Sequence, residues 1–143
     1  MIDPDQRIIS KASNTSEAGH LWMLSQTVSA GESRLRFRLK TGTATTTLVA
    51  SSGPLQTNTW YHVAGVYNAQ ARTLDVYVNG VLDNGTLSGT VPAAQSNSTY
   101  NVHIAQRTGN PGTFNFQGVI DEVHIFNRAL SAAEIRDDMN VAR

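Results

Sequence analysis

The stretch FQGVIDEVHIFNRALSAAEI, residues 116–135, decides the fold class of this chain. Its first half is an apolar run typical of a strand, and its second half carries the signals of a helix start. Ser131 and Glu134 have the three-residue spacing of a capping box, in which each side chain accepts a hydrogen bond from the other residue's backbone N–H. We therefore predict a final strand over about residues 115–126 and a short helix over residues 132–140.

The composition is that of one β-rich domain, and we expect residues 1–143 to share a single core. Charged residues make up 15% of the chain, below the ~25% of an average soluble domain. Ser, Thr, Asn and Gly take their place. Eleven basic and eleven acidic residues cancel, so the net charge favours neither nucleic acid nor an anionic membrane as a partner.

Cysteine is absent, which excludes disulfides and thiolate metal sites. No apolar run approaches the ~20 residues of a membrane-spanning helix. The first residues, MIDPD, lack the basic and apolar regions of a signal peptide. The residues alone therefore leave the compartment unknown.

Short segments with period-two apolar patterning recur between turn signals, which predicts an antiparallel sandwich. In residues 73–78, Leu74, Val76 and Val78 should face inward. The following Asn79-Gly80 favours a two-residue type I′ hairpin, because both positions need positive φ. Residues 85–98 read as a loop that holds at most one short strand. The other predicted strands are residues 6–11, 20–26, 33–40, 43–50, 60–67, 81–83 and 100–106.

Further blocks point to a known family: NTWYHVAGVY at residues 58–67 leading to LDVYVNG at 74–80, and QRIISK at 6–11 followed by LRFRL at 35–39. With the C-terminal stretch, they make the chain resemble the laminin-G-like, concanavalin-A-like jelly rolls. The resemblance implies an all-β antiparallel jelly-roll sandwich with a short C-terminal helix. It also implies a mostly non-catalytic domain that recognises sugars or other proteins, at an extracellular or cell-surface location.

One departure from the family pattern bears on assembly. Family members usually begin with two or three strands before the block seen here at residues 6–11. The resemblance thus implies an N-terminally short domain whose sheets have open edges. Open edges are templates for association, so we expect a homodimer formed through the edges or faces left open.

Catalysis is not predicted. Fold relatives that hydrolyse glucans present E-x-D-x-x-E on one strand, and retaining glycosidases need two carboxyl groups about 5–5.5 Å apart. The nearest match, Asp121-Glu122, is adjacent in sequence, and adjacent strand residues point to opposite faces. We name no catalytic residue and rank a glycoside hydrolase third among the functions.

No cofactor is predicted, with calcium as the one candidate. His20, His62, His103 and His124 lack metal-ligand spacing, and His62 reads as a packed, hydrogen-bonded side chain. Many laminin-G-like domains bind calcium, and the resemblance makes Asp121 the natural ligand. The alternative is that Asp121 accepts backbone N–H bonds at a bend before Val123.

Candidate binding residues lie in two places. Arg34, Arg36, Arg38 and Lys40 alternate with apolar residues and should form a solvated outer face; alternatively, Arg36 and Arg38 could grip an anionic glycan. Arg107, Asn110 and the residue 85–98 loop lie between strands, where binding residues concentrate. Trp22 and Trp60 are assigned to the core.

The leading hypothesis is therefore a non-catalytic recognition module for carbohydrate. The alternative is a protein–protein or self-association module. Loop aromatics and amides that converge on an open concave face would favour the first.

Overall fold

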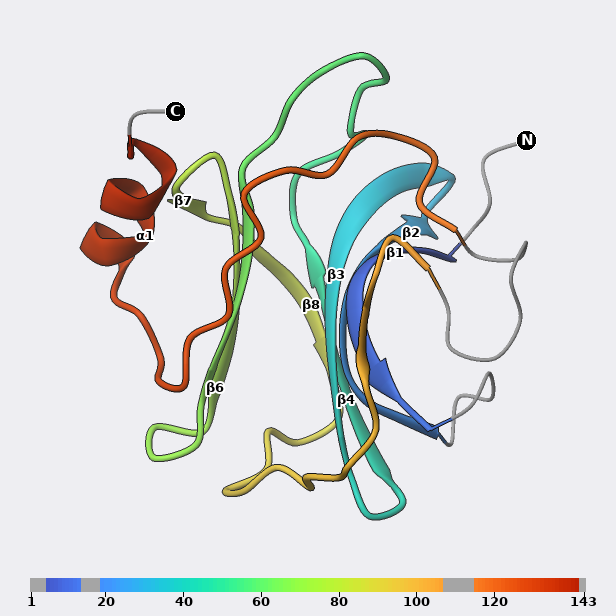
Figure 1. Ribbon diagram of the computed structural model, residues 1–143, viewed down its shortest axis with the longest axis vertical. Helices are drawn as coiled ribbons and strands as arrows, with labels where there is room; N and C mark the ends of the chain where they lie inside the picture. The colour runs from blue at the N-terminus through green and yellow to red at the C-terminus, as the bar shows by residue number, and fades with distance from the viewer. Residues whose placement is uncertain (1–4, 14–18, 107–114, 142–143) are drawn as a thin grey trace.

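The computed structural model describes residues 5–13, 19–106 and 115–141. Within them the chain forms two antiparallel sheets and one helix (Figure 1). This is the predicted all-β jelly-roll sandwich with a short C-terminal helix. The elements are β1 (Asp5–Ala12), β2 (His20–Ser29), β3 (Glu32–Thr41), β4 (Ala44–Ala50), β5 (Val63–Asn68), β6 (Thr73–Val78), β7 (Val81–Leu82), β8 (Asn84–Ser88), β9 (Val102–Ile104) and α1 (Ala132–Met139).

The larger sheet has six strands in the order β8-β4-β3-β2-β1-β9. One row of cross-strand partners spans five of them: Ile9, Leu24, Phe37, Leu48 and Leu87. The first four are buried. Period-two alternation puts this apolar row on one face, and that face forms the main core with the inward side chains of the smaller sheet.

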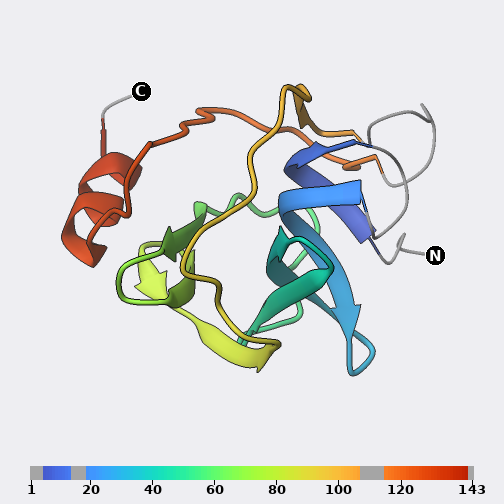
Figure 2. The ribbon, with the colours of Figure 1, turned by 90° about the horizontal axis from the view of Figure 1, so that it is seen from below.

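The smaller sheet, β5-β6-β7, lies between the larger sheet and helix α1 and is the middle of three layers. Leu74 and Val76 of β6 are buried in the core between the sheets and Val78 packs against it, as predicted. The outer face packs Val66 and Tyr77 against Ile135 of α1. Figures 1 and 2 show the helix on the side of this sheet away from the larger one.

Both predicted local motifs are confirmed. Asn79 and Gly80 have φ of 52° and 73°, as a type I′ turn requires. At the helix start, the Ser131 N–H donates to Glu134 Oε2 at 2.8 Å, and the Glu134 N–H donates to Ser131 Oγ at 3.3 Å. The capping box therefore forms in full.

The predicted final strand is wrong for most of its length. Asn115 forms an isolated bridge with Arg7, and the Phe116 N–H donates to the Ala105 carbonyl. Beyond Gln117 the segment joins no strand ladder. Residues 115–131 instead cross from the β1 side of the larger sheet to helix α1 (Figure 1). The segment has the apolar pattern of a strand, but no strand in the described part of the chain pairs with it beyond Gln117.

Other elements differ from prediction only at their ends, and β8 is the one short strand allowed within residues 85–98. No helix in the described part of the chain is long and apolar enough to cross a membrane.

Candidate functional site

A cleft of about 1160 Å³ opens between the two sheets on one side of the sandwich. Its floor is the apolar inner face of the larger sheet, including Trp22, Leu24 and Phe37. The β4–β5 loop and β5 form one wall, and residues 116–130 form the other. On another side, the loop after β8 closes the sandwich: Val91 is buried in the core, and the Tyr67 hydroxyl donates to the Pro92 carbonyl at 2.8 Å.

Trp60 lies on this cleft, and its assignment to the core is wrong. The side chain is 62% exposed and precedes β5, which begins only at Val63. It makes no hydrogen bond with any other residue of the described part of the chain. Trp22, in contrast, is half-buried and packs against the core as predicted.

The loop that carries Trp60 is held at its base by the larger sheet. The Leu55 N–H donates to the Ser33 carbonyl at 2.9 Å, and the Arg34 guanidinium donates to the carbonyl of Ser51. Gly53 is required for this close approach, because a Cβ at that position would lie 2.8 Å from Arg34 Cγ. The tip is braced by the Gln56 N–H, which donates to the Tyr61 hydroxyl at 3.0 Å.

Amide side chains complete the wall. Asn58 on the loop and Gln117 on the facing segment both line the cleft. Neither side chain is used in a hydrogen bond within the described residues, although the Gln117 backbone N–H donates to Gln6 Oε1 at 3.2 Å. An amide offers both a donor and an acceptor, so these two groups can bind a polar ligand from opposite walls.

A cluster of histidines and carboxylates connects the cleft wall formed by residues 116–130 to helix α1. His124 Nδ1 lies 2.9 Å from Asp138 Oδ1, and His62 Nε2 lies 3.9 Å from the other oxygen of the same carboxylate. His124 Nε2 lies 3.8 Å from Glu122 Oε2. The sequence indicated a packed His62, but it did not show that both histidines converge on Asp138, since residues 62, 124 and 138 are far apart in the chain.

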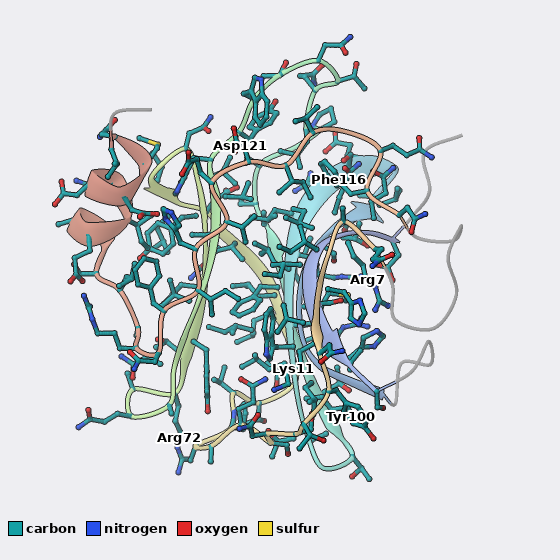
Figure 3. The ribbon with its side chains drawn as sticks, viewed as in Figure 1. Arg7, Lys11, Arg72, Tyr100, Phe116 and Asp121 are labelled. Carbon is teal, nitrogen blue, oxygen red and sulfur yellow. The ribbon has the colours of Figure 1, made fainter. Side chains whose placement is uncertain are left out.

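Asp121 lies midway along residues 115–131, which we call the crossing segment, between Phe116 and helix α1 (Figure 3). Its Oδ1 accepts the Glu122 N–H at 2.9 Å, which is the bend-stabilising alternative weighed for this residue. Glu122 has a φ of 49°, so the strand alternation used to separate Asp121 from Glu122 does not hold here. Among the described residues, no group of three or more histidines and carboxylates could hold a metal ion, and the calcium role that the resemblance implies for Asp121 stays a prediction.

The basic row of β3 is not the solvated face that was predicted. Arg36 is buried and donates to Ser25 Oγ at 3.1 Å and to Asp5. Arg38 donates to Thr47 Oγ1 at 3.0 Å. The row lies on the face opposite the cleft, because it alternates with core residues. Arg107 and Asn110 lie outside the described residues.

The two-sheet sandwich with an open cleft is that of a lectin-like recognition module. A family model described as the concanavalin A-like lectin/glucanases superfamily, in its laminin-G-like branch, matches residues 2–136, and the chain belongs to this family. Laminin-G-like domains are generally non-catalytic binding modules, while the superfamily includes glycosidases. Neither the curated proteins nor the solved structures gave a match.

Proposed function

We propose that this chain is a non-catalytic module that binds a neutral carbohydrate in the cleft. The observation that carries the proposal is the exposed Trp60 side chain on the cleft wall. A tryptophan exposed on a cleft wall offers a large, rigid apolar face beside a polar N–H, which suits contact with the apolar face of a sugar ring.

The chemistry of the loop favours a neutral ligand. Residues 55–62 read LQTNTWYH and hold no aspartate, glutamate, lysine or arginine. Hydroxyl and amide groups from Thr57, Asn58 and Gln117 line the same cleft and match the donors and acceptors of sugar hydroxyls. The arginine row that could bind sulfated or uronic sugars lies on the opposite face of the sheet and is occupied by intramolecular partners.

The size of the cleft favours an oligosaccharide over a single sugar. Small-molecule sites usually enclose about 300–1,000 Å³, and this cleft is larger than that range. A chain of several rings could lie along it with one ring on Trp60. The aromatic and amide side chains that line the cleft support carbohydrate recognition over the protein–protein alternative.

The test is an array of neutral, sulfated and uronic glycans, followed by calorimetric titration with the best oligosaccharide. Trp60→Ala should abolish binding, whereas Tyr100→Ala should leave it unchanged. Tyr100 is also exposed, but it is not among the residues that line the cleft, and in Figure 3 it lies well below Asp121 of the cleft wall. Unaltered binding by Trp60→Ala, or selective binding of anionic glycans, would refute the proposal.

The non-catalytic part has its own test. Incubation with β-glucans and other polysaccharides should release no reducing ends above a buffer blank. Turnover that disappears in Asp121→Asn and Glu122→Gln would instead identify a hydrolase.

Self-association is the second candidate function. It is favoured by a different observation, the unpaired and apolar crossing segment, and its contact surface is inferred in the next subsection.

A further inference from the structure

Residues 118–126 form a free polypeptide edge. Within the described residues, none of their backbone groups hydrogen-bonds to another backbone group. The segment nevertheless carries the apolar residues of a strand, and these are open to solvent: Val119 is 72% exposed, Ile125 64% and Phe126 48%. Unpaired edges with exposed apolar side chains are templates for strand pairing.

The sequence of this edge is self-complementary. If VIDEVHIF, residues 119–126, is laid antiparallel to a second copy of itself about its centre, Val119 faces Phe126, Ile120 faces Ile125 and Asp121 faces His124. Directly opposite residues of an antiparallel pair share a face and contact each other. The register therefore joins apolar with apolar residues in its two outer pairs and a carboxylate with an imidazole in the third, while Glu122 faces Val123 beside the axis.

We propose that two copies of this chain associate about a two-fold axis through residues 119–126, paired as antiparallel strands. Such an axis makes the contact isologous, so each of these pairs occurs twice. The proposal names the surface for the homodimer expected from the sequence. It does not rest on carbohydrate binding, because its test does not use Trp60, although residues 119–126 also form part of the cleft wall.

The bend in the segment fits this arrangement. Glu122, with its φ of 49°, lies next to the proposed axis. Because strand alternation fails at Glu122, regular pairing is expected only for the outer pairs on either side of the bend, Val119 with Phe126 and Ile120 with Ile125. The contact of His124 with Asp138 and that of Ser131 with Glu134 also anchor the segment to helix α1 and its start, which keeps the edge extended and lowers the entropy lost on pairing.

Another free edge competes with this surface. β8 lies at the end of the larger sheet, and its Leu87 is also exposed. The rest of β8 reads Asn84, Gly85, Thr86 and Ser88, so the only large apolar side chain it offers is Leu87. Leu87 therefore provides the matched control.

The test introduces a charge at one opposed pair, Val119 and Phe126. The readout is the molecular mass in solution, measured by light scattering and sedimentation over a range of concentrations. The wild type should reach twice the 15.5 kDa chain mass. Val119→Asp and Phe126→Lys should each weaken association at least about tenfold, since a buried charge would face an apolar partner. Leu87→Asp should leave association unchanged. Circular dichroism should show that each variant is folded.

Mixing the two weakened variants gives the decisive result. One side of a mixed pair then places Asp at 119 opposite Lys at 126, and the other side keeps the wild-type contact. The mixture should therefore form heterodimers although each variant alone is monomeric. A monomeric wild type, a dimer that only Leu87→Asp disrupts, or a mixture that stays monomeric would each overturn the proposal.

Discussion

Gly65 of β5 lies directly against the ring of Phe37 of β3, where the two sheets meet. A Cβ built on Gly65 would come within 2.8 Å of Phe37 Cγ and 2.9 Å of Cδ1. The absence of a side chain at 65 thus allows the phenyl ring to fill the space between the layers. This contact lies at the edge of the cleft, because both residues also line it.

Gly65→Ala should therefore lower the free energy of unfolding by about 1–3 kcal/mol, the usual cost of overpacking a core. Denaturant titration would measure it. Phe37→Leu in the same chain should remove part of the clash, so the double variant should lose less than the sum of the two single losses. Simple additivity would contradict the contact.

The Arg36–Asp5 ion pair should contribute strongly to stability. Arg36→Met removes this partner of Asp5, and the Nη2 atom of Arg7 lies farther from the Asp5 carboxylate, at 3.7 Å. Removing one partner of a buried pair costs about 3–5 kcal/mol, and the lower end applies because Asp5 is partly exposed. Arg38→Met loses the hydrogen bond from Arg38 Nε to Thr47 Oγ1, and loss of one such bond should cost about 1 kcal/mol in the same denaturant titration. Equal losses would show that burial of Arg36 is not what matters.

Ser131→Ala should cost about 0.5–2 kcal/mol, because Ser131 is the N-cap and its hydroxyl accepts the Glu134 N–H. Thermal or denaturant unfolding would report the loss. Ser88→Ala, at an exposed serine of β8, is the control and should leave the free energy of unfolding unchanged. If both variants match the wild type, Leu130 and Ile135 hold the helix without its cap.

Acid should weaken the capping box of Ser131 and Glu134, because protonation removes the charge of the Glu134 carboxylate. The Arg128 guanidinium, followed by the backbone and side chain of Ser131, lowers the pKa of Glu134 from 4.5 to about 2. A depressed carboxyl pKa gives stability that is present above pH 4.5 and lost as the pH falls toward 2. The free energy of unfolding, measured at several pH values across this window, should therefore change less with pH in Glu134→Gln than in the wild type. Because the pair is exposed, high salt should reduce the difference.

Trp60→Ala should change stability by no more than about 0.5 kcal/mol, as expected for a surface position. Trp22→Ala should cost about 3 kcal/mol, since Trp22 packs against the core. The comparison of the two unfolding midpoints tests the corrected position of Trp60 directly. Similar losses would return Trp60 to a structural role.

Local patterns carried most of the fold. Alternation placed Leu74, Val76 and Val78 correctly, the Asn79-Gly80 pair set a hairpin, and the spacing of Ser131 and Glu134 set the helix start. Each of these depends on residues close in sequence, so the physical cause can be read from the residues themselves.

What the sequence could not show depends on distant parts of the chain. Trp60 has the neighbours of a strand residue, but β5 starts three residues later and leaves the indole on the loop. Arg36 looked solvated because its partner Asp5 is 31 positions away. Residues 118–126 have a strand pattern and lack a strand partner, which only the three-dimensional arrangement reveals.

The crossing segment also determines how the domain would bear mechanical load. On the open side of the sandwich, residues 115–131 span the two sheets, and their far end is fastened by the His124–Asp138 contact, the helix cap and the packing of Ile135. Tension applied at the C-terminus would reach these attachments before it reached any strand ladder. We expect the helix to detach and the cleft to widen at low force, while the six-stranded sheet stays intact until much higher force.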